Sequence, residues 1–278
     1  RLGELRSDTR QAIEPAVNSI IEQNNFTIEK TTIQKIPCLH IQPSKVKVAW
    51  KILYGFGGGY VSGSPFEDLT IAAPISVATG AIMIIPHYRL APENPWPTPV
   101  DDGFLVYQEL SKECFALVGE SAGGNLGLAL MHRAKRSGTP FPKAIALLSP
   151  WCDLTNSGYS LVDNDGRDPV LTKQHLDFAA KCYGKENNLA DTDISPMNGK
   201  FDSTFPPCYI STGTRDLLMS QSICLANKLR EHGVKVDLRV WEDLWHVFEW
   251  DNNLPEAKAS IGAISEFLTH HMNKICGG

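Results

Sequence analysis

The sequence lacks a long hydrophobic run, an excess of positive charge and any internal repeat. No apolar segment in its 278 residues approaches the roughly 18 residues that a membrane-spanning helix requires. Lysine and arginine number 26 against 31 for aspartate and glutamate, so the formal net charge is −5 and no basic surface for nucleic acid is expected. These absences predict a globular chain with no membrane span and no nucleic-acid partner, long enough to bury a full core.

Cysteine occurs without the spacing of a metal site. The seven cysteines are odd in number and never form a Cys-x-x-Cys pair: Cys38, Cys114, Cys152, Cys182, Cys208, Cys224 and Cys276. We therefore expect reduced, mostly buried thiols in a cytoplasm rather than a disulfide framework or a zinc site. The polar start, Arg1–Arg10, does not resemble a secretory signal. Because the chain does not begin with Met, we also expect trimming upstream of Arg1.

Short apolar runs alternate with helical patterns along most of the chain. The predicted buried strands are Val48–Tyr54, Ala81–Pro86, Phe115–Val118, Ala144–Leu148, Cys208–Ile210 and Val236–Val240. The predicted helices are one that begins at Ser64, then Val100–Ser111, Ala122–Arg136, Leu217–His232 (with Gly233 as its terminating residue) and Pro255–Met272. This alternation indicates an α/β fold with a mostly parallel sheet covered by helices on both faces.

Two segments depart from that alternation. Phe26–Gln42 alternates polar and apolar residues, which predicts an antiparallel hairpin at the edge of the sheet. Cys152–Lys200 is rich in Asn, Asp and Gly and holds one helical pattern, Thr172–Tyr183. An insertion of this length is typical of a lid or cap.

At the first helix, Ser64 and Glu67 have the spacing of a capping box.

The stretch Val118–Asn125, VGESAGGN, carries the clearest chemical motif. It follows an apolar run and opens a helical pattern, and Gly119, Ser121 and Gly123 form Gly-x-Ser-x-Gly. In a strand–turn–helix context this is a nucleophile elbow, which exposes the serine hydroxyl and points the next N–H, that of Ala122, toward the same spot. The alternative is a glycine-rich turn with an incidental serine.

A nucleophilic serine needs a base and an acid that orients the base. In this fold the expected order along the chain is serine, acid, histidine. Asp216 follows a predicted strand and His246 lies after the last one, so Ser121, Asp216 and His246 form the predicted triad. The competing bases are His232, His270 and His271, and the competing acids are Glu242 and Asp243.

The stretch Leu53–Gly63, LYGFGGGYVSG, ends a predicted strand with three glycines. Negative charge on an attacked carbonyl oxygen requires N–H donors that already point at it. Gly57, Gly58 and Gly59 would let the backbone approach that closely. The chain has no Gly-x-x-x-x-Gly-Lys-Ser/Thr motif, so a phosphate-binding loop is not indicated.

Taken together, these motifs resemble the hormone-sensitive-lipase-like esterases of the α/β-hydrolase fold, over nearly the whole chain. The matching stretches are FGGGYVSGSP, HYRLAPENPWP, VGESAGGN, LLSPWCDL, DPVL at Asp168–Leu171, GTRDLL and WHVF. The resemblance implies hydrolysis of carboxylic esters, often with short to medium acyl chains, and oxyanion donors at Gly58, Gly59 and Ala122. It also implies a cap made of residues 1–25 and 152–200, on a catalytic domain of residues 26–151 and 201–278.

The sequence departs from that family at the glycine loop. The family usually has His before the glycines where this chain has Phe56, a bulky apolar residue where it has Gly55, and Asp where it has His87. One interpretation is a coupled exchange, in which Phe56 and His87 pack together and Gly55 makes room for the ring. The other is drift at a position that only braces the loop.

We thus expect a serine carboxylesterase that works through an acyl-enzyme and needs no metal or cofactor. Two alternatives stay open: a small amidase or formamidase with the same triad, and a receptor-like protein that binds a small molecule. Phe56, Tyr60 and Trp245 are weaker candidates for the substrate pocket. The expected partner is a small-molecule ester, and the resemblance also allows a homodimer.

Overall fold

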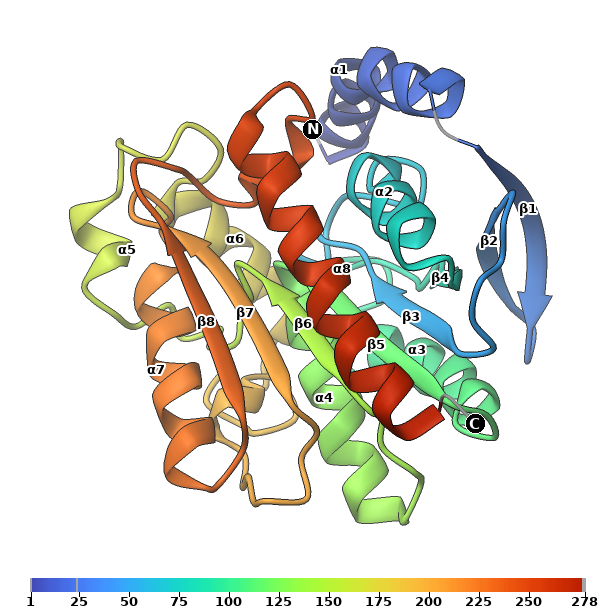
Figure 1. The fold of residues 1–278 in the computed structure, drawn as a ribbon. Coiled ribbons are helices and arrows are strands. Elements are labelled where there is room, and N and C mark those ends of the chain that lie inside the picture. The colour runs from blue at the N-terminus through green and yellow to red at the C-terminus, as the bar shows by residue number, and fades with distance from the viewer. Residues whose placement is uncertain (1, 24, 277–278) are drawn as a thin grey trace.

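Within residues 2–23 and 25–276, which the structure describes, eight strands form one sheet in the computed structural model (Figure 1). The strand order is β1-β2-β4-β3-β5-β6-β7-β8. β1 pairs antiparallel with β2, and β2 with β4; the other pairs are parallel. The strands are β1 (Phe26–Ile33), β2 (Ile36–Pro43), β3 (Lys51–Gly55), β4 (Ile82–Pro86), β5 (Phe115–Glu120), β6 (Ile145–Leu148), β7 (Cys208–Gly213) and β8 (Val236–Trp241).

Helices cover both faces of this sheet. Figure 1 shows α8 crossing in front of the strands, where it contacts α2, β5, β6 and β7. The helix α4 packs on α3, β3 and β5. The helices are α1 (Leu2–Gln23), α2 (Leu69–Thr79), α3 (Thr98–Leu110), α4 (Ala122–Ser137), α5 (Ser160–Asp163), α6 (Lys173–Gly184), α7 (Met219–Glu231) and α8 (Pro255–Cys276), with short 3-10 turns η1 (Pro196–Asn198) and η2 (Phe248–Trp250).

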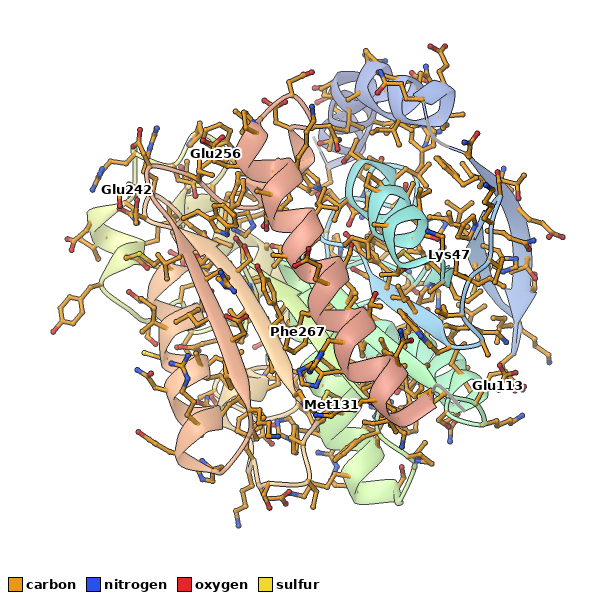
Figure 2. The ribbon with its side chains drawn as sticks, in the orientation of Figure 1. Lys47, Glu113, Met131, Glu242, Glu256 and Phe267 are labelled. Carbon is orange, nitrogen blue, oxygen red and sulfur yellow. A yellow bond between two sulfur atoms is a disulfide. The ribbon has the colours of Figure 1, made fainter. Side chains whose placement is uncertain are left out.

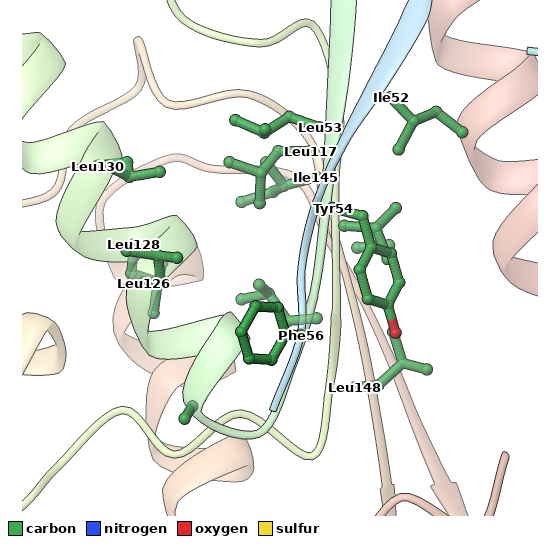
Figure 3. Packing of buried hydrophobic residues seen from close by; sticks show 14 of the residues in the cluster. Ile52, Leu53, Tyr54, Phe56, Leu117, Leu126, Leu128, Leu130, Ile145 and Leu148 are labelled. Atoms are coloured by element: carbon green, nitrogen blue, oxygen red, sulfur yellow. The ribbon is translucent and has the colours of Figure 1, made fainter. Parts of the chain in front are cut away.

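The central strands are apolar on both faces because both faces are covered. Figure 3 shows Leu53 pointing toward α4 while Ile52 and Tyr54, its neighbours on β3, point to the opposite side. All six residues of β5 and of β7 are buried. On the α8 side, Phe267 packs against Tyr209 of β7 with ring centroids 5.6 Å apart (Figure 2). The loops at the ends of β3, β5 and β7 therefore start from a rigid base.

The structure confirms the mostly parallel sheet and the antiparallel hairpin at its edge. The predicted helix start at Ser64 is wrong. The hydroxyl of Ser64 does contact the carboxylate of Glu67, but the residues that follow Ser64 form a turn and α2 begins at Leu69. The side chain of Asp68, directly before the helix, makes no cap hydrogen bond, because it accepts one from Tyr54 instead.

The expectation that all cysteines are reduced is also wrong. A disulfide joins Cys114, directly before β5, to Cys276 at the end of α8, across 162 residues of sequence. The C-terminal helix packs back across the sheet, which brings the two Cα atoms to 6.2 Å. The other cysteines of the described chain are free, and of these only Cys224 is exposed.

Among the described helices, none combines the length and the apolar character needed to cross a membrane.

Candidate active site

The turn between β5 and α4 presents Ser121. Ser121 has a positive φ of 51°, and the chain enters α4 at the next residue. A Cβ on Gly123 would lie 1.9 Å from the carbonyl oxygen of Gly55, and one on Gly119 would lie 2.4 Å from that of Gly123. Backbone therefore packs directly on backbone here, and only glycine fits at both positions. The strained turn aims the hydroxyl away from the sheet.

Ser121, His246 and Asp216 form a hydrogen-bonded row. Nε2 of His246 lies 3.0 Å from Oγ of Ser121, and Nδ1 of His246 lies 3.0 Å from Oδ1 of Asp216. The three side chains are buried. A carboxylate at Asp216 can only accept, so Nδ1 carries the proton and Nε2 is free to accept the serine proton. This is the geometry of an activated serine nucleophile.

The charges in this row support one another. Burial by itself raises the pKa of Asp216, but the charge and hydrogen bond of His246, together with the other hydrogen bonds that Asp216 accepts, outweigh that effect, so the net pKa is lowered. Oδ2 of Asp216 also accepts from Oγ1 of Thr212 at 2.7 Å, and Oδ1 accepts from the N–H of Leu218 at 2.8 Å. Burial likewise works to lower the pKa of His246, but the charge and hydrogen bond of Asp216, with the charges of Asp168 and Glu249, outweigh it, so that pKa is raised. Asp216 is therefore ionised at neutral pH and stabilises an imidazolium when one forms.

Asp168 ties the insertion to both loops of the triad. Its Oδ2 accepts from the backbone N–H of His246 at 3.3 Å and of Leu217 at 3.2 Å. Its Oδ1 accepts from the N–H of Val170 at 2.8 Å and of Leu171 at 3.2 Å. In the sequence, Asp168 stood out only as part of a matching motif, with no role assigned to it. The available signal in the sequence was the Asp-Pro pair at Asp168, which two apolar residues follow.

The glycine loop runs beside Ser121. Gly58 and Gly59 have φ of +95° and +62°, and a Cβ on Gly58 would lie 2.3 Å from the carbonyl oxygen of Ser62. The turn from Gly58 to Ser62 is held by two backbone hydrogen bonds. The carbonyl oxygen of Gly58 accepts from the N–H of Val61 at 3.1 Å and from that of Ser62 at 2.9 Å. The three glycines and Ser121 line one cavity. Ala122, the first residue of α4, is buried.

That cavity has a volume of about 280 Å³. Apolar side chains from the insertion and from η2 form much of its wall. The lining residues are Thr9, Gly57, Gly58, Gly59, Ser62, Gly63, Glu67, Asp68, Ser121, Val170, Leu171, His175, Leu176, Ala179, His246 and Trp250. The sequence did not point to His175, and it favoured Trp245 over Trp250 because Trp245 adjoins His246 along the chain. A pattern along one segment does not reveal which distant segment faces it.

Phe56, Tyr60 and Trp245 are not among these lining residues. The ring of Phe56 is fully buried on the α4 side of β3 (Figure 3). Tyr60 stacks on Tyr183 of α6 with ring centroids 3.9 Å apart, and its hydroxyl donates to Asn125 at 2.8 Å. Trp245 packs against the small apolar cluster of Leu244, Phe248 and Ala257. The side chains of Phe56 and Tyr60 thus lie in the core, and that of the partly buried Trp245 lies against a separate small cluster, rather than in the cavity wall.

The surroundings of Phe56 bear on the two interpretations of the glycine loop. Its ring lies 6.2 Å from that of His87, edge to face, and stacks on Tyr88 at 4.0 Å. The hydroxyl of Tyr88 donates to the carbonyl oxygen of Phe56 at 2.6 Å. Phe56 and His87 are therefore neighbours, as a coupled exchange requires. Gly55, in contrast, makes room for the backbone of Gly123, the nearest atoms to any Cβ placed there, and not for the ring.

The competing triad candidates lie elsewhere. Nδ1 of His232 is hydrogen-bonded to the carbonyl oxygen of Lys228 at 2.8 Å, on the end of α7. His270 and His271 lie together on α8. Glu242 and Asp243 are exposed. Within residues 2–23 and 25–276, no group of three or more His, Cys, Asp or Glu side chains is arranged to hold a metal ion.

Comparisons with known proteins agree on one kind of fold. Residues 52–250 match the model of a family described as alpha/beta hydrolase fold. An acetyl-hydrolase of Streptomyces hygroscopicus is 32% identical over 228 residues, 78% of this chain and 74% of that protein. An esterase of Acinetobacter venetianus is 31% identical over 225 residues, with the same coverage of 78% and 74%. A crystal structure of an esterase from the bacterial hormone-sensitive lipase (HSL) family has a TM-score of 0.89 at 31% identity, and covers 95% of this chain and 90% of that one.

Proposed function

This chain belongs to the α/β-hydrolase family and is a carboxylic ester hydrolase, and we propose that it cleaves esters through an acyl-enzyme formed on Ser121. The observation that carries the proposal is the row of two 3.0 Å hydrogen bonds that joins Ser121 to His246 and His246 to Asp216. The row opens into the cavity beside the glycine loop. It supplies a nucleophile, a base and an orienting acid in one place.

The proposed reaction has two acyl-transfer steps. Nε2 of His246 takes the hydroxyl proton while Oγ of Ser121 attacks the ester carbonyl, and the resulting imidazolium then protonates the departing alcohol. Water, deprotonated by His246, attacks the acyl-enzyme and releases the acid with Ser121 restored. Asp216 holds the imidazole and stabilises its cation in both steps.

We assign the oxyanion donors to the N–H groups of Gly58, Gly59 and Ala122. Both glycines line the cavity and Ala122 opens α4 directly after Ser121, where the positive end of the helix dipole favours an anion. Phe56, in our proposal, stands where related esterases carry a histidine. The chemistry needs the glycine N–H groups and not an imidazole, and the loop keeps a brace through the 2.6 Å hydrogen bond from Tyr88 to the Phe56 carbonyl.

The size of the cavity supports the proposal that the substrate carries a short to medium acyl group. Its volume of about 280 Å³ lies just below the range of about 300–1,000 Å³ that is usual for drug-sized ligands. Thr9 of α1 and several residues of the 152–200 insertion contribute to its wall. This supports the division into a cap of residues 1–25 and 152–200 on a catalytic domain of residues 26–151 and 201–278.

Hydrolysis of p-nitrophenyl esters, from acetate to long acyl chains, tests the proposal. We expect turnover that is highest on the shorter chains and is lost in Ser121→Ala by about 10⁴-fold or more. Undiminished turnover in Ser121→Ala would rule out the acyl-enzyme. Matched anilides in the same assay separate an esterase from an amidase, and faster anilide cleavage would favour the amidase.

A further inference from the structure

Two buried carboxyl groups lie behind the glycine loop, and proton transfer at Ser121 uses neither of them. Glu120 is the last residue of β5, directly before Ser121, and is fully buried. Asp68 precedes α2, is 2% exposed and lines the cavity beside Gly57. Burial of two acids next to a site where negative charge develops needs a physical explanation.

Glu120 has no hydrogen-bond donor. Both of its Oε atoms are buried and without a donor among the described residues. A carboxylate without water or donors is far less stable than the neutral acid. Burial, together with the charge of Asp68, raises the pKa of Glu120 well above its ordinary value. Glu120 is therefore a neutral acid that carries one O–H to donate.

Asp68 is the acceptor for that proton. Burial raises the pKa of Asp68 to about 7, while hydrogen bonds from Glu120 and from Tyr54 act in the opposite direction. The hydroxyl of Tyr54 donates to Oδ2 of Asp68 at 3.0 Å. Asp68 thus ionises before Glu120. Two buried carboxyls in contact do not both ionise, so they titrate as one pair that keeps a proton between them.

The pair touches the first residue of the glycine loop. A Cβ on Gly57 would lie 1.9 Å from Oε1 of Glu120 and 2.6 Å from its Oε2, so the loop backbone rests directly on this carboxyl group. Gly58 and Gly59, the proposed oxyanion donors, follow at once. A shift of the carboxyl pair would therefore move them.

We propose that Glu120 and Asp68 share one proton and that this acid pair positions the glycine loop for catalysis, with Glu120 donating to Asp68 and its carboxyl group seated against Gly57. The proposal rests on the proposed esterase function. Phe56, whose ring stacks on Tyr88, has no polar side chain to brace the loop from its own position. The shared proton also limits the pair to a single negative charge beside the oxyanion.

The groups that face the pair from neighbouring elements keep its proton in place. They are Tyr54 of β3, Tyr88 after β4, Glu67 before α2 and Glu249 of η2. The tyrosines are fully buried with raised pKa, mainly through burial, and stay neutral. The two glutamates raise the pKa of the acid that each faces. None of these four described residues is a cation that would draw the proton off.

Infrared spectroscopy detects the shared proton without any substrate. At neutral pH the wild type should show the carbonyl band of a protonated carboxylic acid, and Glu120→Gln should lose it. Asp216→Asn is the matched control, because Asp216 is equally buried but its pKa is lowered, so it carries no carboxylic acid proton at neutral pH. The band should survive in that variant. Identical spectra for the wild type and Glu120→Gln would overturn the proposal.

Kinetics tests the positioning role. Glu120→Leu should lower kcat by about tenfold to a hundredfold with a smaller change in KM, because the loop is misplaced but the cavity persists. Glu120→Gln, whose amide donates to Asp68, should restore most of that loss. Tyr54→Phe removes a donor from Asp68 without touching the elbow, and should lower kcat by a smaller factor even if Glu120→Leu does not fold. Wild-type kcat in a folded Glu120→Leu would contradict the role.

The two proposals fail separately. If the wild type hydrolyses no ester, or if Ser121→Ala keeps its activity, the esterase mechanism fails while the infrared band still reports the pair. If the band is missing and Ser121-dependent hydrolysis persists, only the acid pair is overturned.

Discussion

Asp216 and Glu120 are two fully buried carboxyl residues close to Ser121, and they differ in their hydrogen-bond donors. Asp216 accepts from the His246 ring, from the Thr212 hydroxyl and from a backbone N–H, and its pKa is lowered although burial opposes this. Glu120 has no donor, and its pKa is raised by burial. The same depth of burial thus gives a carboxylate on one side and a neutral acid on the other, because donors decide the charge.

The largest expected effect on kcat comes from a change at Asp216, the ionised one of the two carboxyl residues. Asp216→Asn should lower kcat by about 10⁴-fold, because the amide no longer stabilises the imidazolium or fixes its tautomer. Steady-state hydrolysis of p-nitrophenyl acetate measures it. The matched control is Asp243→Asn, an exposed acid on the histidine loop, which should keep nearly full kcat. If Asp243→Asn lost its activity and Asp216→Asn kept it, the acid that orients His246 would be Asp243 and not Asp216.

The pH dependence of kcat/KM examines the same side of the site. The pKa of His246 is raised above its ordinary 6.5, since Asp216, with smaller contributions from Asp168 and Glu249, outweighs the opposing effect of burial. The base must be neutral, so activity should fall as the pH drops through this raised pKa, by about tenfold per unit at low pH. A pH–rate profile should therefore place the acid limb above pH 6.5. A limb well below that value would mean that His246 is not held by an ionised acid.

Asp168 gives a smaller effect, because it positions the triad loops without touching substrate. In Asp168→Asn an amide nitrogen replaces one of the two carboxylate oxygens. The variant therefore loses either the acceptor for the N–H groups of His246 and Leu217 or the acceptor for those of Val170 and Leu171. We expect kcat to fall by about tenfold to a hundredfold with the fold intact. Asp163→Asn, an exposed acid in the same insertion, is the control. Equal losses in both variants would point to a general effect of charge removal.

The pH dependence of stability should separate the two carboxyls by sign. A carboxyl with a raised folded pKa loses stability as pH rises above its unfolded value, by at most about 1.4 kcal/mol per unit for one proton. Glu120→Gln should remove that loss, so its stability relative to wild type should grow with pH. Asp216→Asn should do the opposite, because a lowered pKa stabilises at pH above the unfolded value. Urea unfolding at several pH values measures both, and parallel profiles would contradict the contrast.

The sequence was sufficient for the local parts of the site. The elbow at Ser121 and the strand ends before Asp216 and His246 are encoded within a few residues each, and the order of the three along the chain follows from the parallel sheet. The structure brings these three residues into one hydrogen-bonded row, and their catalytic roles stay a prediction. The strands were predictable for a similar reason, since their apolar runs need no partner to be recognised.

Features that depend on distant segments were not predictable. The disulfide joins Cys114 to Cys276 across 162 residues, and no spacing rule reports the return of α8 to the start of β5. The start of α2 was misplaced because the Ser64–Glu67 pattern forms its contact within a turn. The acid pair of Glu120 and Asp68 could not be predicted either, because in the sequence each of the two residues is an ordinary charged side chain.

The most direct test of the account is to look for the acyl group on the serine. The enzyme is mixed with p-nitrophenyl butyrate, quenched in acid and digested, and the peptide that contains Ser121 is weighed by mass spectrometry. We predict a butyryl group on that peptide in the wild type and none in Ser121→Ala, which should also release no p-nitrophenol above background. Steady turnover with an unmodified peptide, unchanged in Ser121→Ala, would contradict it.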